Sequence, residues 1–102
     1  MGAVFQLEDT FTITGRGLVL AGQLVEGVVR VGDRVQLPLG GGDRPARVTG
    51  VEIGHSLAAD GSARGFLGLL VGELPPAEIP LVRSALAAGQ VLHIESATEQ
   101  PG

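Results

Sequence analysis

The stretch FQLEDTFTITGRGLVLAGQLV (residues 5–25) alternates apolar and polar side chains in its first half and continues as a mostly apolar segment after a short break that contains two glycines. In its first half, the odd positions form an apolar series that is interrupted only at Asp9: Phe5, Leu7, Phe11 and Ile13. A period of two residues is typical of a strand with one buried face. Because glycine reaches the positive φ angles of tight turns, Gly15–Gly17 predicts a β-hairpin, with Leu18–Val25 as the returning strand.

The rest of the chain repeats this pattern of short apolar segments separated by glycines, of which the sequence has 17. Further strands are expected at Arg34–Leu39, Arg44–Ile53, Ala63–Val71 and Val91–Glu95, with a loop over Gly54–Ser62. The segments between them contain no series of the amphipathic crossover helices that a parallel sheet needs. The sequence therefore predicts an all-β, closed, six-stranded antiparallel barrel, because closure removes exposed strand edges.

One segment departs from the β pattern. Pro80 is suited to the first turn of a helix, and Gly89 to a left-handed cap at its end. Between them, apolar residues fall on one helical face: Leu81, Val82, Ala85 and Leu86. We therefore expect a short helix over Pro80–Ala88, before the last strand. It has two open roles: a lid over one end of the barrel, or an interface for a partner or a second copy through Leu81, Val82 and Leu86.

The length of 102 residues, with 44% hydrophobic and 18% charged residues, indicates one globular domain. We expect residues 1–96 to form it and 97–102 to be a flexible tail. The chain has no cysteine and no lysine. This excludes thiolate metal sites, thiol catalysis, a Walker A loop and Schiff-base catalysis. The two histidines lack metal-ligand spacing, so neither a metal nor another cofactor is expected.

The charge of the chain restricts its partners. Seven arginines and eleven acidic residues give a net charge of −4, which offers no general attraction to phosphate backbones or anionic lipids. We therefore expect no DNA or membrane binding, and only weak, local binding of RNA. The first basic residue is Arg16, and the apolar runs are too short to span a bilayer. The expected location is cytoplasmic.

Four segments together resemble the second domain of elongation factor Tu and related translational GTPases. They occur in the family's order: Phe11–Gly22, Gly27–Val35, Val48–Ile53 and Gly89–Leu92. The resemblance extends from about Phe5 to Ile94. It implies a six-stranded Greek-key β-barrel of the translation-protein type. In that family, the domain follows a GTPase domain and helps to hold the aminoacyl end of transfer RNA.

The chain departs from the family pattern at several points. It has no GTPase domain, so GTP hydrolysis is not expected of it. Val71 stands where the family commonly has arginine, and the segment Glu73–Ala88 is longer than usual. We therefore expect a non-catalytic binding module that engages a translation-related protein or an RNA, including aminoacyl-tRNA. The alternative is a structural or regulatory protein that uses the barrel as a scaffold and the predicted helix as an interface.

Three residues are candidates for binding: Glu52, Arg16 and His55. The resemblance implies that Glu52 occupies the position of a glutamate that lies against the terminal adenosine of aminoacyl-tRNA. Gly54 and His55 stand where the family has an aromatic residue and an arginine, so Glu52 can also be a solvated strand residue. Arg16 has the rigid guanidinium that suits a phosphate or a carboxylate, but it equally suits the exposed tip of a turn.

No catalytic residue is predicted. His55, Ser56 and Asp60 are the residue types of a hydrolytic triad, but adjacent residues cannot orient one another as a triad requires. His93 alternates with apolar neighbours and is expected on the outer face of the last strand. The three aromatic residues, Phe5, Phe11 and Phe66, are expected in the core, which leaves no ring for stacking on bases.

Overall fold

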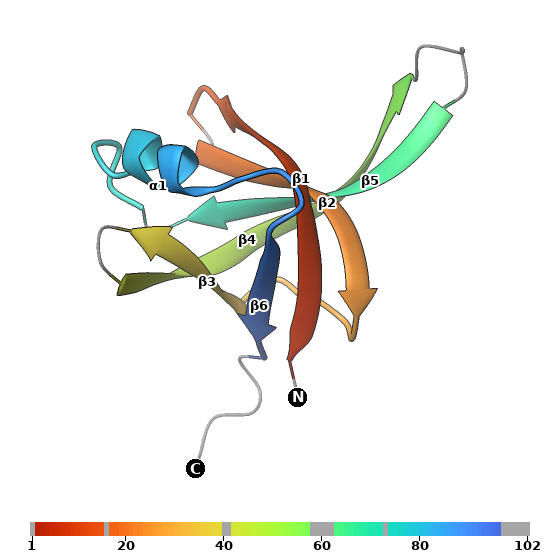
Figure 1. Ribbon diagram of the computed structural model, residues 1–102, viewed down its shortest axis with the longest axis horizontal. Helices are drawn as coiled ribbons and strands as arrows, with labels where there is room; N and C mark the ends of the chain where they lie inside the picture. Colours follow the sequence, from red (N-terminus) through yellow and green to blue (C-terminus); the bar gives the residue numbers. More distant parts are fainter. Residues whose placement is uncertain (1, 16, 40–41, 58–62, 73, 97–102) are drawn as a thin grey trace.

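The computed structural model describes residues 2–15, 17–39, 42–57, 63–72 and 74–96. Within them the chain forms six strands and one helix (Figure 1): β1 Ala3–Ile13, β2 Gly17–Glu26, β3 Arg34–Leu39, β4 Gly42–Leu57, β5 Ala63–Gly72, α1 Ile79–Ala85 and β6 Val91–Glu95. The strands close into an antiparallel barrel in the order β1-β2-β5-β4-β3-β6. The predicted all-β barrel, with a short helix before the last strand, is confirmed.

The strand order contains a Greek key. Strands β3, β4 and β5 follow one another as hairpins. Strand β2 lies beside β5, on the side of β5 that faces away from β4. Strand β6 then closes the barrel between β1 and β3. Both the N-terminal end of β1 and the C-terminal end of β6 therefore lie at the same end of the barrel (Figure 1).

The core fills the barrel with aliphatic side chains and one aromatic ring. Alternation is clearest in β6, where Leu92 and Ile94 are buried and His93 is exposed, as the sequence predicted. The buried cluster comprises Ala3, Phe5, Leu7, Leu18, Leu20, Val35, Leu37, Ala46, Leu69, Val71, Val82, Leu92 and Ile94. Burial of this apolar surface is the main favourable contribution to the stability of the barrel.

The hairpin of β4 and β5 is longer than the sequence indicated. The predicted loop over Gly54–Ser62 is wrong in its first part, because β4 continues to Leu57 and pairs with β5 as far as Ala63. Gly54 does not end the strand, since it lies opposite Phe66 and leaves room for the Phe66 ring. The outer part of this hairpin projects from the barrel as a two-stranded arm (Figure 1).

A β-bulge in β1 corrects the prediction for Phe11. Leu7 pairs with Gly22 and Asp9 with Ala21, so Glu8 is an extra residue in the ladder. An extra residue exchanges the faces of all positions that follow it. Phe11 consequently lies on the outer face with 38% of its surface exposed, whereas Phe5, before the bulge, is fully buried.

Helix α1 is shorter than predicted. It ends at Ala85, not Ala88, and Gly89 is not its cap. Gly89, with a φ of 88°, belongs instead to a separate turn in which the Gln90 amide donates to the Ala87 carbonyl at 3.0 Å. The Gln90 side chain also accepts a hydrogen bond from the Ala87 amide at 3.0 Å. The chain therefore forms a turn here, where the sequence predicted that the helix continues.

Helix α1 packs against the barrel as a lid would. Val82 is fully buried in the core and Leu86 is half-buried against it, whereas Leu81 is 59% exposed. Polar contacts hold the helix from two sides. Arg83 donates to the Thr10 carbonyl of β1 at 3.4 Å, and Arg44 of β4 lies 3.2 Å from the Glu78 carboxylate at the helix N-terminus.

Replacing Val82 by alanine tests the lid. The change removes buried methyl groups between α1 and the barrel, so we expect a loss of about 2 kcal/mol in the free energy of unfolding. Leu81→Ala, on the exposed side of the same helix, should change it by less than about 0.5 kcal/mol. Urea unfolding of both variants measures the difference, and equal losses would contradict the observed orientation of the helix.

Candidate functional site

Glu52 lies at the centre of an open surface on the outer face of β4. Its side chain is exposed, and on β5 it stands opposite Gly68. The positions two residues before and after it on the same face of β4 are Gly50 and Gly54. These glycines place no side chain beside Glu52, but the Phe66 ring of β5 fills the space over Gly54, and Leu70 lies beside Gly50.

Phe66 provides an aromatic ring beside Glu52. It lies opposite Gly54 in the register, and its ring atoms Cε1 and Cε2 stand 2.8 Å from where a Gly54 side chain would begin. Phe66 is therefore on the outer face of β5, half-buried over Gly54, and not in the core as predicted. A lone aromatic residue opposite a glycine on the next strand is a signal for this arrangement. That signal can be read only when the register of β4 and β5 is known.

On the other side of Glu52 the surface is aliphatic. Leu70 lies opposite Gly50 on β4 and opposite Val19 on β2, and it is half-buried. We use the name outer strip for this surface of β4 and β5, made up of Gly50, Glu52, Gly54, Phe66, Gly68 and Leu70. It combines a carboxylate and an aromatic ring, which together can bind a flat, hydrogen-bonding ligand.

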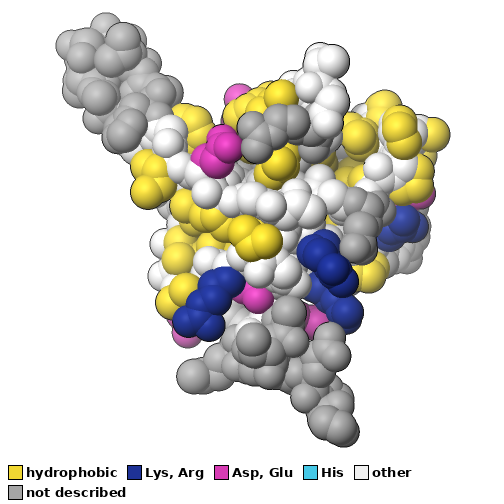
Figure 2. All heavy atoms as spheres, turned by 180° about the vertical axis from the view of Figure 1, so that it is seen from behind, with side chains coloured by type: hydrophobic (Ala, Val, Ile, Leu, Met, Phe, Trp, Pro, Cys, Tyr) yellow, Lys and Arg dark blue, Asp and Glu magenta, His cyan; other side chains and the backbone are white. Residues whose placement is uncertain are grey.

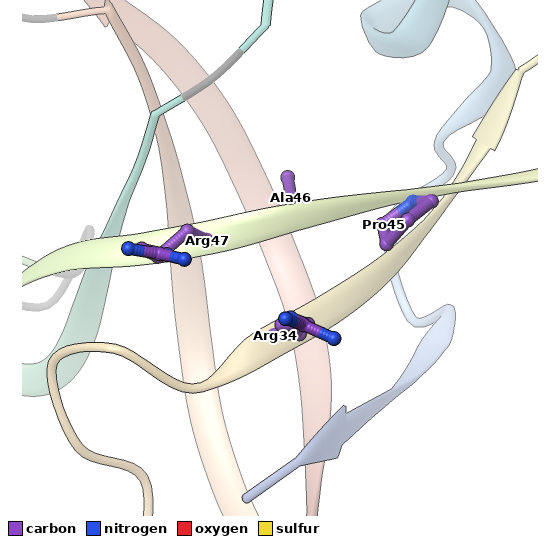
Figure 3. A pocket seen from close by; sticks show the side chains of 4 residues that line it. All are labelled: Arg34, Pro45, Ala46 and Arg47. Atoms are coloured by element: carbon purple, nitrogen blue, oxygen red, sulfur yellow. The ribbon is translucent and has the colours of Figure 1, made fainter. Parts of the chain in front are cut away.

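A second feature lies on the β3–β4 hairpin. Arg34 and Arg47 face each other directly across the two strands, and both are exposed. With Pro45 and Ala46 they line a hollow of about 190 Å³. Figure 3 shows the two guanidinium groups on neighbouring strands beside this hollow. The sequence did not predict this site, because residues separated by a turn come together only through the hairpin register.

A third feature is an apolar hollow of about 390 Å³ where the β4–β5 arm leaves the barrel. Its apolar lining includes Leu24, Ile53 and Leu67. Ile53 is 79% exposed, because the barrel no longer covers this part of β4. Gln23 stands at its edge and donates to the Gly65 carbonyl at 2.7 Å, which connects β2 to the arm.

The other predicted binding residues are only partly placed. The backbone of His55 lies in β4 opposite Gly65, and its side chain is outside the described part of the structure. Arg16 and Asp60 are also outside the described residues. Arg16 and His55 therefore both stay predictions.

Among the residues that the structure describes, no group of three or more histidine, aspartate or glutamate side chains could hold a metal ion. No helix in the described part is long and apolar enough to span a membrane. A comparison of the chain with models of known protein families gives no match. The candidate site is therefore defined by its geometry, and the outer strip is its most complete part.

Proposed function

We propose that this chain is a non-catalytic binding module that holds the aminoacyl end of a transfer RNA on the outer strip. The observation that carries the proposal is the position of Glu52. Its carboxylate is exposed between glycines, with the Phe66 ring across the strand pair at the next position on the same face. The likeness of Val48–Ile53 to the second domain of elongation factor Tu supports the same ligand.

The chemistry of the outer strip suits a terminal nucleotide. A carboxylate accepts hydrogen bonds from a ribose 2′-hydroxyl or a base amine, and only RNA offers the 2′-hydroxyl. An aromatic side chain adds stacking on a base, which is tolerant of the base's identity. Gly50 and Gly68 carry no side chains that would stand between Glu52 and the sugar or the aminoacyl ester, and Gly68 itself is buried.

The affinity should be low and should fall with salt. The net charge of −4 opposes a phosphate backbone at long range. On the face seen in Figure 2, arginine side chains form small groups separated by apolar and uncharged surface, so attraction to phosphate is local. Recognition then depends mainly on the end of the RNA and not on its length.

Two substitutions test the outer strip. We expect Glu52→Ala to weaken binding of a short single-stranded RNA with the transfer RNA acceptor sequence about tenfold, because a charged hydrogen-bond acceptor is lost. Phe66→Leu keeps an apolar group over Gly54 but removes stacking, and should weaken binding about fivefold or more. Fluorescence anisotropy with a label at the 5′ end of the RNA measures both effects.

Glu95→Ala is the matched control, because Glu95 is an exposed glutamate on β6, outside the outer strip. It makes the same change of charge and should leave the affinity unchanged or slightly increased. Equal effects of the Glu52 and Glu95 substitutions would indicate a general charge effect. If the wild-type chain binds no RNA at millimolar concentration, the proposal is wrong.

The alternative role, a scaffold that assembles through α1, has less support. Val82 and Leu86 pack against the barrel, so of the three apolar residues expected at this interface only Leu81 is exposed. One exposed leucine offers far less apolar area than the roughly 800 Å² per partner of a standard stable interface.

A further inference from the structure

Strand β4 has an open edge where it leaves the barrel. Strand β3 pairs with β4 only as far as Arg47, and the turn before β3 adds two backbone hydrogen bonds to Val48, at 2.7 and 2.8 Å. Over residues 50–57, β5 pairs with β4 on one side, and no strand in the described part of the structure pairs with it on the other. The open edge therefore presents backbone amides and carbonyls at alternate residues, and these groups can bind an extended chain.

The sequence does little to protect this edge. Natural proteins protect strand edges with charged residues, especially lysine, with proline, or with a bulge. The segment GVEIGHSL (residues 50–57) has no lysine and no proline, and its one acidic residue is Glu52. The bulge of β4 lies at Thr49, so it bends the strand where the open edge begins and does not interrupt that edge. Edges of this kind bind a further strand by β-augmentation.

Ile53 supplies an apolar contact beside the edge. It is 79% exposed, the largest exposed fraction among the large apolar side chains of the described residues. Alternation along β4 places it on the face that does not carry Glu52, where it stands opposite Leu67 of β5. Ile53 and Leu67 also line the hollow of about 390 Å³ at the base of the arm. A strand added at the edge would place every second side chain beside this apolar row.

Glu52 determines the charge of the strand that fits. Its side chain is exposed on the other face of β4. Opposite charges at facing positions of neighbouring strands stabilise a sheet. A carboxylate has two oxygens and accepts several hydrogen bonds, so Glu52 can bind a basic side chain of an added strand in addition to the contact that it makes within the chain. The fitting strand therefore alternates basic residues, on the face of Glu52, with apolar residues, on the face of Ile53.

A second copy of this chain is a poor source of such a strand. The segment that best combines arginine with apolar neighbours, VRVGDRV (residues 29–35), forms the turn before β3 and the start of β3. Val35 is fully buried in the core, and Val29 packs against it. This segment is therefore part of the barrel and is not available to a neighbouring molecule, so the strand has to come from a different protein.

We propose that the edge of β4 over residues 50–54 binds an extended segment of a partner protein, in which basic residues alternate with large apolar residues. The segment becomes a third strand of the arm formed by β4 and β5 (Figure 1). A ribbon of two strands is only marginally stable in water, whereas three strands with an apolar face are stable, so binding stabilises the base of the arm. The proposal does not rest on the proposed function, because it uses the strand edge and the face of Ile53 and needs no RNA.

The experiment titrates the full chain with a short synthetic peptide of alternating arginine and isoleucine, blocked at both ends. Backbone amide resonances are followed by NMR, and amide hydrogen exchange is measured with and without the peptide. A scrambled peptide, in which the isoleucines are contiguous, tests whether charge and composition are sufficient. Two further peptides carry N-methyl groups on the arginines only or on the isoleucines only, because alternate amides of a strand point to opposite sides.

Ile53→Arg tests the site in the protein itself. Because Ile53 is largely exposed, the substitution leaves the core intact. The new charge stands where the apolar residues of the peptide would pack, and it repels the neighbouring arginines. Leu81→Arg is the matched control, since it makes the same change of charge at an exposed apolar residue of α1.

We expect the alternating peptide to shift the amide resonances of residues 50–54 saturably and to slow hydrogen exchange at alternate amides of this segment. One of the two N-methylated peptides should bind about tenfold more weakly or worse, because its hydrogen bonds to the edge are blocked, and the other should bind like the unmodified peptide. Ile53→Arg should weaken binding about tenfold or more, because an apolar contact is lost. Leu81→Arg should leave the affinity unchanged.

Three results would overturn the inference. The first is that the alternating peptide does not bind at millimolar concentration, or that it shifts resonances outside residues 50–54 only. The second is that the scrambled peptide, or both N-methylated peptides, bind as well as the unmodified peptide, which would indicate attraction of charge without strand pairing. The third is that the chain dimerises in sedimentation equilibrium and Ile53→Arg makes it monomeric, which would assign the edge to a second copy. None of these results depends on whether the chain binds RNA.

Discussion

Phe5→Ala should reduce the free energy of unfolding by about 3–5 kcal/mol. Phe5 is the largest fully buried side chain of the barrel. Its ring lies over Gly22 of the neighbouring strand β2. Its removal opens a cavity among aliphatic side chains that closed strands cannot collapse to fill. For a domain of this size, we expect the melting temperature to fall by at least about 12 °C, measured by circular dichroism.

Phe11→Ala is the matched control, because it removes the same side chain from the same strand. Phe11 lies after the bulge and is 38% exposed on the outer face. Phe11→Ala should therefore reduce the free energy of unfolding by about 1 kcal/mol or less, because the ring is already partly exposed. Losses of similar size in the two variants would contradict the bulge at Glu8 and would restore the unbroken alternation that the sequence suggested.

Gly22→Ala should destabilise the barrel by about 3 kcal/mol, a large effect for the addition of one methyl group. The new Cβ would overlap the Gln6 carbonyl oxygen and lie 3.0 Å from Cζ of Phe5. The carbonyl belongs to the backbone of β1, so the conflict can be relieved only by moving the strand near its bulge. Chemical unfolding in urea measures the loss.

Gly42→Ala is the corresponding control. Gly42 also lies in a strand, but no atom stands within 4 Å of its Cβ position, and its φ is not in the left-handed region. We expect no loss of stability, or a small gain, because alanine restricts the unfolded chain more than glycine does. A Gly22→Ala protein that is as stable as Gly42→Ala would show that β1 and β2 are less closely apposed than described.

Much of the fold follows from local sequence. The β1–β2 hairpin, β3 and β6 were predicted from alternation and glycine turns, and the bounds of β3 and β6 agree with the structure. Strands β3 and β6 are short, so the period of two is unbroken within each, whereas β1 contains the bulge at Glu8. The turn at Gly15 and Gly17 has φ angles of 80° and 103°, as glycine at those positions predicted.

The candidate site was predicted only in part. Glu52 was predicted from the likeness of its segment to a known family; it is exposed, and its role in binding stays a prediction. Phe66 was assigned to the core because an aromatic residue in an apolar segment is most often buried. Its place over Gly54 depends on which residue of β4 stands opposite it, and no local pattern contains that information.

The sequence by itself determined the class of the fold, the chain order of the strands and the absence of lysine and cysteine chemistry, because these depend on composition and on patterns between near neighbours. Only the tertiary structure decided which face each residue occupies after the bulge at Glu8, and that Arg34 faces Arg47. Strand register joins residues that are distant along the chain, and a shift of one residue exchanges the two faces. The surface that brings Glu52 and Phe66 together is therefore a property of the closed barrel.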